Sequence, residues 1–166
     1  NSVTLNGLTI INSNTFTFSP LSPVDPGDDG YPTKSDHDNF DARANYGGAI
    51  TISGNHKVTN CIIRNAYLKG GNGGNGKDGD GTNVNGGDGG YGGDAGGAGI
   101  LIWSGNPVIR NTIIEDCQVV AGNGGNGANG NASDPLGVGG RGRVTGRAIG
   151  TAICIYDWYG ASATFE

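Results

Sequence analysis

Short stretches of alternating apolar and polar residues recur along the chain at intervals of about fifty residues. Residues 48–55 (GAITISGN) and 99–106 (GILIWSGN) both place apolar side chains at every second position and end in a Ser-Gly-Asn turn. A period of two residues is typical of β-strands with one buried face, and Ile, Val and Thr favour strands. The pattern therefore predicts an all-β fold.

These stretches belong to an internal repeat with an offset of 51 residues (99 − 48 = 51). Three separate blocks share this offset without a gap, which makes the repeat a strong signal. The blocks are 48–55 on 99–106, 58–65 on 109–116, and 73–76 on 124–127. We therefore expect one domain, residues 1–166, built from about three stacked copies.

A third copy is predicted when the two ends of the chain are joined. Residues 151–156 (TAICIY) match the first strand of each copy. Ala163–Glu166 would then precede the second strand, which residues 1–12 supply. This alignment puts Asn6 in the place of Asn60 and Asn111, and Leu8 in the place of Ile62 and Ile113.

A single copy has only two predicted strands and cannot bury its apolar face, so copies are expected to stack. Each strand would pair in parallel with its equivalent, about 4.8 Å away, and asparagine side chains would bond along the axis. Asn also tolerates left-handed turns, so the alternative is that these asparagines are turn residues alone. The predicted stacking ladder comprises Asn6, Asn60, Asn111, Leu8, Ile62 and Ile113.

The phrases VTLNGLTIIN, GGAITISGNHKVTNCIIRN and GNPVIRNTIIEDC resemble coils of right-handed parallel β-helix proteins. They are most similar to the polymorphic outer-membrane and pectate-lyase-like repeats of large bacterial surface proteins. The resemblance covers the strand segments, about half of the chain, and implies a right-handed parallel β-helix (solenoid). It implies little about function, because the fold carries adhesins, lyases and fibres. The expected coil strands lie near 3–12, 48–66, 99–120 and 148–166.

Glycine fills the segments between the strands. It makes up 35 of the 166 residues and recurs at every third position in 70–79, 87–99 and 124–130. This spacing is typical of an extended helix with three residues per turn. Collagen does not fit, because proline is absent from 70–99 and each run doubles back. We predict polyglycine-II hairpins, with a flexible glycine-rich loop as the alternative.

The predicted insertions between the coil strands are 13–46, 69–98 and 121–147. The first contains most of the prolines and an acidic stretch, so we interpret it as a capping or lateral-contact loop. In the glycine-rich insertions we expect polar side chains to face solvent. These side chains are Asn72, Asn75, Asp88 and Asp94.

The net charge of −5 and the scattered basic residues disfavour nucleic acid as a partner. No apolar run approaches the ~20 residues of a membrane span. The sequence has no Met and no signal peptide, so we expect a processed protein or a piece of a longer one. Richness in Asn, Thr, Ser and Gly favours an extracellular or cell-surface location. The resemblance to bacterial surface proteins implies a bacterial source and makes glycans candidate ligands.

The candidate chemistry is sparse. The only candidate cofactor is calcium, and its weak candidate ligands are Asp36, Asp38, Asp78 and Asp80. The alternative is that these residues lie in solvated polar loops. We assign no catalytic and no cofactor-binding residue. Arg64 falls opposite Glu115 and is interpreted as a surface ion pair rather than a lyase base. The three cysteines, Cys61, Cys117 and Cys154, are an odd count, so at most one internal pair can form. Cys61 and Cys117 are expected to be buried free thiols.

The ends of such a stack suggest a function. Unpaired strand edges recruit further chains, and no capping helix is evident at either end. We therefore expect a structural, non-enzymatic protein whose copies stack head to tail in a filament. Alternatives are a segment of a large bacterial surface adhesin and, less favoured, a polysaccharide lyase. The predicted junction residues are Val3, Leu5, Ile153, Ile155 and Phe165.

Overall fold

A computed structural model describes residues 2–11, 45–79, 85–133, 137–156 and 160–166. This part of the chain contains fifteen short strands in five sheets and no helix, and every strand pair is parallel. The prediction of an all-β chain with parallel pairing is confirmed. Within the same ranges, no helix of the length and apolarity needed to span a membrane is found.

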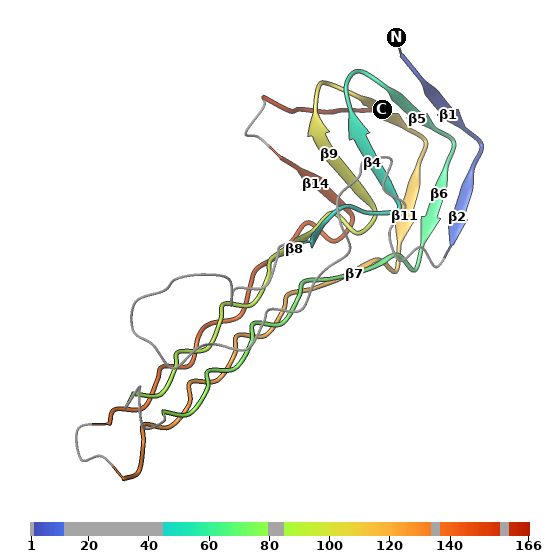
Figure 1. Cartoon of the computed structure of the whole chain (residues 1–166). Helices are drawn as coiled ribbons and strands as arrows, with labels where there is room; N and C mark the ends of the chain where they lie inside the picture. The colour runs from blue at the N-terminus through green and yellow to red at the C-terminus, as the bar shows by residue number, and fades with distance from the viewer. Residues whose placement is uncertain (1, 12–44, 80–84, 134–136, 157–159) are drawn as a thin grey trace.

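The chain makes repeated passes through the same set of strand positions (Figure 1). An initial partial pass holds β1 (Thr4–Asn6) and β2 (Thr9–Ile11). Two complete passes and a final partial pass follow. The second pass holds β3 (Asn45–Tyr46), β4 (Ile50–Ser53), β5 (Lys57–Thr59), β6 (Ile62–Arg64) and β7 (Tyr67–Lys69). The third holds β8 (Ala95–Gly96), β9 (Ile100–Ser104), β10 (Val108–Arg110), β11 (Ile113–Glu115) and β12 (Gln118–Val120). The last holds β13 (Ala148–Ile149), β14 (Ile153–Ile155) and β15 (Thr164–Phe165).

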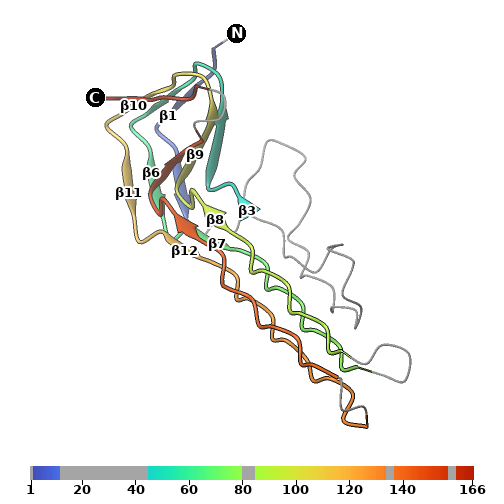
Figure 2. The same cartoon turned by 90° about the vertical axis from the view of Figure 1, so that its left-hand side faces the viewer.

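Each strand pairs only with its equivalent in a neighbouring pass. The sheet orders are β1-β5-β10-β15, β2-β6-β11, β3-β8-β13, β4-β9-β14 and β7-β12. Figures 1 and 2 show the equivalent strands lying side by side, with β1 and β2 at one end of the stack. The N-terminal and C-terminal strands therefore form opposite ends of one strand stack.

The offset between the second and third passes is not constant, which corrects the gapless alignment. Ile50 pairs with Ile100 (100 − 50 = 50), whereas Lys57 pairs with Val108 (108 − 57 = 51). The register changes just after Ile52, and Trp103 in β9 is the extra residue. A bulge of this kind adds one residue that has no partner on the neighbouring strand. The flanking glycines and asparagines, which match between the two passes, hid this residue in the sequence alignment.

The N-terminal register also differs from the expected one. Asn6 pairs with Thr59, and Thr9, rather than Leu8, pairs with Ile62. Gly7, with φ +69°, therefore occupies the corner position that Asn60 fills with φ +52° in the next pass. Both residue types tolerate this left-handed conformation. The sequence alignment matched Asn6 with Asn60 and therefore set the register of residues 8–11 wrong by one residue.

The interior of the stack is a set of apolar ladders. Val58, Ile63, Leu68, Ile100 and Ile102 point inward and are almost completely buried. Corners between successive strands need a left-handed residue, and short polar side chains adopt that conformation most readily. Among the described residues, the non-glycine residues with positive φ are Asn60, Asn65, Asn111 and Asp116, each between two strands of a pass.

An arm of glycine-rich segments projects from the strand stack (Figure 2). We call it the glycine arm and divide it into thread 1 (70–79), thread 2 (85–94), thread 3 (121–131) and thread 4 (137–147). The threads are joined by backbone hydrogen bonds at every third residue, for example from Gly73 N–H to Asn123 O at 2.8 Å. Within the described residues, thread 3 contacts all three other threads.

Glycine is required where the threads touch. A Cβ atom on Gly125 would lie 1.8 Å from the carbonyl oxygen of Gly74, and one on Gly122 would lie 1.6 Å from that of Gly71. Real Cβ atoms do not approach so closely, so any side chain at these positions would push the threads apart. The three-residue glycine period is thus the condition for backbone contact.

Candidate functional site: two open ends of the strand stack

The predicted asparagines lie together along the stack. Asn60 donates from Nδ2 to Asn6 Oδ1 at 2.9 Å, and Asn111 donates to Asn60 Oδ1 at 3.4 Å. Thr59 Oγ1 also donates to Asn6 Oδ1, at 3.1 Å. The side chain of Asn6 therefore reaches the ladder although its backbone lies one position earlier.

The aliphatic residues of the predicted ladder have a different place. Ile62 pairs with Ile113, as expected, but Ile113 faces outward and is 50% exposed. Leu8 is also exposed and does not pair with Ile62. The inward ladder of this sheet contains Ile10, Ile63 and Ile114 instead. Successive side chains of a strand point to opposite faces, so the buried residues are the neighbours of the predicted ones. The repeat alone does not show which of the two faces is buried.

A second ladder was not anticipated. In the arm, Asn72 Oδ1 accepts the N–H of Asn123 at 3.0 Å, and Asp88 Oδ1 accepts the N–H of Arg141 at 2.7 Å. The side chains predicted to face solvent therefore also fix the next thread. Further acceptors of this kind in the arm are Asn75, Asp78, Asn85 and Asp94. In the strand stack, Asn55 accepts in the same way from the N–H of Asn106. The recurrence of Asn or Asp at every third position was the signal for it.

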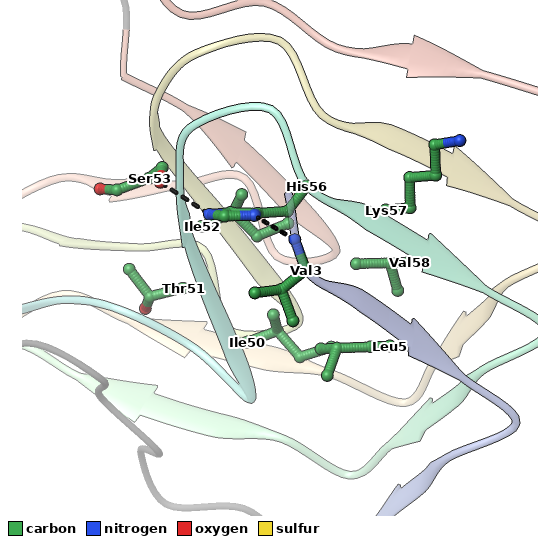
Figure 3. Close-up of a pocket in the computed structure, with 9 residues that line it drawn as sticks. All are labelled: Val3, Leu5, Ile50, Thr51, Ile52, Ser53, His56, Lys57 and Val58. Atoms are coloured by element: carbon green, nitrogen blue, oxygen red, sulfur yellow. Dashed lines mark hydrogen bonds between the residues drawn. The ribbon is translucent and has the colours of Figure 1, made fainter. Parts of the chain in front are cut away.

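The N-terminal end of the stack is hollowed. A pocket of about 360 Å³ opens beside β1, and its apolar lining includes Val3, Leu5, Ile50 and Ile52. Figure 3 shows these side chains gathered near His56. Among the described residues, β4 has no strand from an earlier pass at its outer edge, so the pocket lies where a layer of apolar side chains would continue the stack.

His56 ties β1 to this end. The N–H of Val3 donates to His56 Nδ1 at 3.1 Å, and His56 Nε2 lies 2.9 Å from the carbonyl oxygen of Ser53 (Figure 3). Because Nδ1 accepts and the Ser53 carbonyl can only accept, these two bonds fit the tautomer with its proton on Nε2.

At the C-terminal end of the stack, apolar side chains are exposed at positions whose equivalents in the earlier passes are buried. Val58 is 1% exposed and Ile109 is 5% exposed, whereas Phe165, which pairs with Ile109, is 56% exposed. In the neighbouring sheet Ile102 is fully buried and its partner Ile155 is 41% exposed. In the part of the chain that the structure describes, the apolar ladders therefore continue to the end of the stack without a covering layer.

The structure corrects the predicted relation between the two termini. β1 and β15 are the two outer strands of a single four-stranded sheet. Leu5 pairs with Val58, and Phe165 pairs with Ile109, so both occupy one strand position in different passes. Ala163–Glu166 therefore does not precede the strand formed by residues 4–6. It is the equivalent of that strand.

The predicted metal ligands form no site in the described part of the chain. Asp78 accepts a hydrogen bond from the backbone of Asn129 at 2.9 Å, and no group of three or more His, Cys, Asp or Glu is found there. Asp36, Asp38 and Asp80 lie outside the described residues. All three cysteines are free thiols, and Cys61 is buried as expected, whereas Cys117 is only partly buried. Cys154 is also buried. Burial raises the pKa of the Cys154 thiol.

Charged side chains tie neighbouring passes together at the surface. Arg64 and Glu115 form the predicted ion pair, and both are partly exposed, so the pair adds little stability. At the base of the arm, Asp94 accepts from Tyr46 Oη at 3.1 Å and from Arg147 at 3.0 Å. Burial, and then the charge of Asp94, raises the pKa of Tyr46 to about 12. Burial would raise the pKa of Asp94, but its hydrogen bonds outweigh that effect and lower it.

Comparison of the chain with protein-family models, curated proteins and solved structures gave no match. Function is therefore inferred from the geometry of the strand stack and its two ends.

Proposed function

We propose that this chain is a structural subunit of an extracellular filament in which copies stack head to tail, and that it has no catalytic role. In this proposal the passes form about three coils of a right-handed parallel β-helix, and the glycine arm is a polyglycine-II-like bundle. The exposure along one apolar ladder carries the proposal. Val58 and Ile109 are buried within it, whereas Phe165 at its end is exposed.

The direction of the strands supports a filament rather than a closed dimer. All strand pairs are parallel, so the layer that would continue the stack is related to the last one mainly by translation along the axis. The C-terminal end of one copy would then meet the N-terminal end of the next. Such a heterologous contact does not close on itself and produces an open polymer.

Exposed edges support the same proposal. At the C-terminal end, β13, β14 and β15 are the last strands of their sheets among the described residues. Their outer edges carry unpaired backbone N–H and C=O groups, which pair readily with another strand. Burying these edges together with Phe165 and Ile155 would satisfy both the polar and the apolar groups.

The proposed location is outside the cell, at a bacterial surface, with glycans as candidate ligands. The location is supported by a composition rich in Asn, Thr, Ser and Gly, and the bacterial source and glycans by the resemblance to bacterial surface proteins. The same two ends would equally suit coils within a longer surface adhesin, where covalently linked coils would cover them. The open ends therefore favour axial stacking in either setting.

Sedimentation velocity over a range of concentrations, with electron microscopy of the largest species, tests the proposal. We expect linear polymers in the unaltered protein. Phe165→Asp should raise the concentration at which polymers form by about tenfold to a hundredfold, because a buried Phe stabilises by about 1.5–3 kcal/mol.

Val144→Asp is the matched control, since Val144 is 68% exposed on the arm, away from both ends. It should polymerise normally. A protein that stays monomeric at all concentrations, or one whose polymers ignore Phe165→Asp, would contradict the proposal.

A further inference from the structure

The number of strands in each sheet limits how two copies can meet. Among the described residues, the sheets β2-β6-β11, β3-β8-β13 and β4-β9-β14 each hold three strands, and the sheet β7-β12 holds two. If copies follow one another at a rise of three coils, these three sheets continue without a gap. The sheet β1-β5-β10-β15 holds four strands, so at that rise it contains one strand too many.

The surplus strand is β1 or β15, because the two are equivalent. Thr4 pairs with Lys57, and Thr164 pairs with Val108, which itself pairs with Lys57. In the same way, Leu5 and Phe165 are the outer members of one inward ladder. One of these strands must leave its place when the three-stranded sheets of the two copies join.

Resting on the proposed filament, we infer that β15 of one copy replaces β1 of the next copy on β5. Phe165 would then take the place of Leu5 against Val58. Leu5 is already partly buried, whereas Phe165 is 56% exposed, so the exchange buries more apolar surface than it releases.

The pocket at the N-terminal end favours the same direction of exchange. Leu5 borders a space of about 360 Å³ next to Ile50 and Ile52. A phenylalanine ring fills more of that space than a leucine side chain does. At the position of Leu5 itself Phe165 therefore fills the space better, although Ala163, the equivalent of Val3, is smaller than valine.

Exchange at this sheet would bring the three-stranded sheets of the two copies into register. β2 would pair with β11 of the preceding copy, and β4 would pair with its β14. Ile155 of that copy would then cover Ile52, extending a ladder in which Ile52 and Ile102 are already buried. Release of β1 would also free His56 from the N–H of Val3.

Engineered cysteine pairs distinguish the exchanged junction from simple contact of the ends. Paired residues on adjacent strands lie about 4.8 Å apart, within the range of about 4.4–6.8 Å between Cα atoms that a disulfide spans. In one copy Thr164 and Lys57 both flank Val108, on opposite sides, so their Cα atoms are too far apart to be bridged. A disulfide between these positions must therefore join two copies.

The experiment oxidises two double variants of the full chain and separates them on non-reducing gels. Thr164→Cys with Lys57→Cys should give a ladder of covalent oligomers on the gel. Thr164→Cys with Thr4→Cys should form no disulfide between copies and should run as a single chain. The unaltered protein, with its own three free thiols, is the control.

The opposite result, a ladder only with the Thr4→Cys pair, would overturn the exchange while leaving the filament intact. Absence of ladders from both pairs, together with monomeric sedimentation of the unaltered protein, would overturn the filament as well. Removal of residues 1–6 provides a second measurement. It should lower the concentration at which polymers form, and an increase would contradict the exchange.

Discussion

The strand stack and the glycine arm both consist of parallel extended segments from successive passes, yet different forces stabilise them. In the stack, side chains such as Ile63 and Ile102 fill the interior, and the apolar surface that they bury stabilises the fold. In the arm, backbone atoms of neighbouring threads touch directly, as at Gly125 and Gly74, and hydrogen bonds replace the apolar interior.

This difference predicts opposite sensitivities to mutation. The stack should be sensitive to the loss of side-chain volume, because a cavity in a close-packed interior is costly. The arm should be sensitive to the addition of a single methyl group, because its threads leave no room for one. Substitutions that remove or add volume in each region therefore test the comparison.

The largest effect is expected in the interior of the stack. Ile63→Ala should lower the free energy of unfolding by about 2–5 kcal/mol, since Ile63 is fully buried between Ile10 and Ile114. Urea unfolding followed by circular dichroism measures it. Ile113→Ala, on the outer face of the same sheet, is the control and should cost less than about 1 kcal/mol. Equal losses would show that the inward ladder is assigned to the wrong residues.

A smaller and more local effect is expected in the arm. Gly125→Ala should separate threads 1 and 3 and weaken several hydrogen bonds, at a total cost of about 2 kcal/mol. Hydrogen exchange should become faster in the arm and stay unchanged in the stack. At Gly142 a Cβ would lie 3.8 Å from the nearest atom, so Gly142→Ala should have no such effect. Identical exchange in the two variants would refute the close contact of the threads.

The corners of the stack allow backbone and side-chain effects to be separated. Asn111 has φ +46° and donates to Asn60, so Asn111→Ala should cost about 1–2 kcal/mol through strain. Asn111→Gly relieves the strain and loses only the side-chain hydrogen bond, so its cost should be smaller. Thermal unfolding of both variants measures the difference. If glycine were as harmful as alanine, the ladder rather than the corner would be the main contribution of this residue.

The smallest effect is expected at the base of the arm, from Tyr46 and Asp94. The pKa of Tyr46 is raised to about 12 from an ordinary value of 10.0, first by burial and then by Asp94. Its contribution to stability is therefore complete below pH 10 and is lost as the pH rises toward 12. The pKa of Asp94 is lowered from its ordinary value of 3.8, so its contribution to stability is present above pH 3.8 and is lost at lower pH.

Because these groups are near the surface, the loss should stay below about 1 kcal/mol. Unfolding midpoints in urea at pH 8, 10 and 12 measure it for Tyr46. The control is Tyr46→Phe, in which this part of the pH dependence should disappear. A variant with an unchanged slope above pH 10 would assign the titration to other tyrosines.

The repeat in the sequence was sufficient to predict parallel stacking of equivalent strands. Ile62 pairs with Ile113, and Asn60 bonds to Asn111, because the 51-residue offset places them at the same position in each pass. The offset held wherever the strands between corners had equal lengths. The fold class follows from this regularity, since only stacked copies bury the apolar positions.

The registers at Gly7 and Trp103 were not predicted. A corner accepts either Gly or Asn, so the sequence did not reveal that Gly7 occupies the corner instead of Asn6. A bulge adds a residue without changing the strand pattern on either side, which hid Trp103. The equivalence of the strands at the two termini was missed for the same reason. A two-residue strand such as Thr164–Phe165 carries too little pattern to fix its register.

Helical reconstruction of the assembled protein by electron cryomicroscopy tests the head-to-tail filament most directly. Three coils at about 4.8 Å each predict a rise of about 14 Å per subunit, with the strands perpendicular to the axis. A filament of this rise would agree with continuous sheets across the junction. Closed oligomers, or a polymer whose strands run along its axis, would contradict the account.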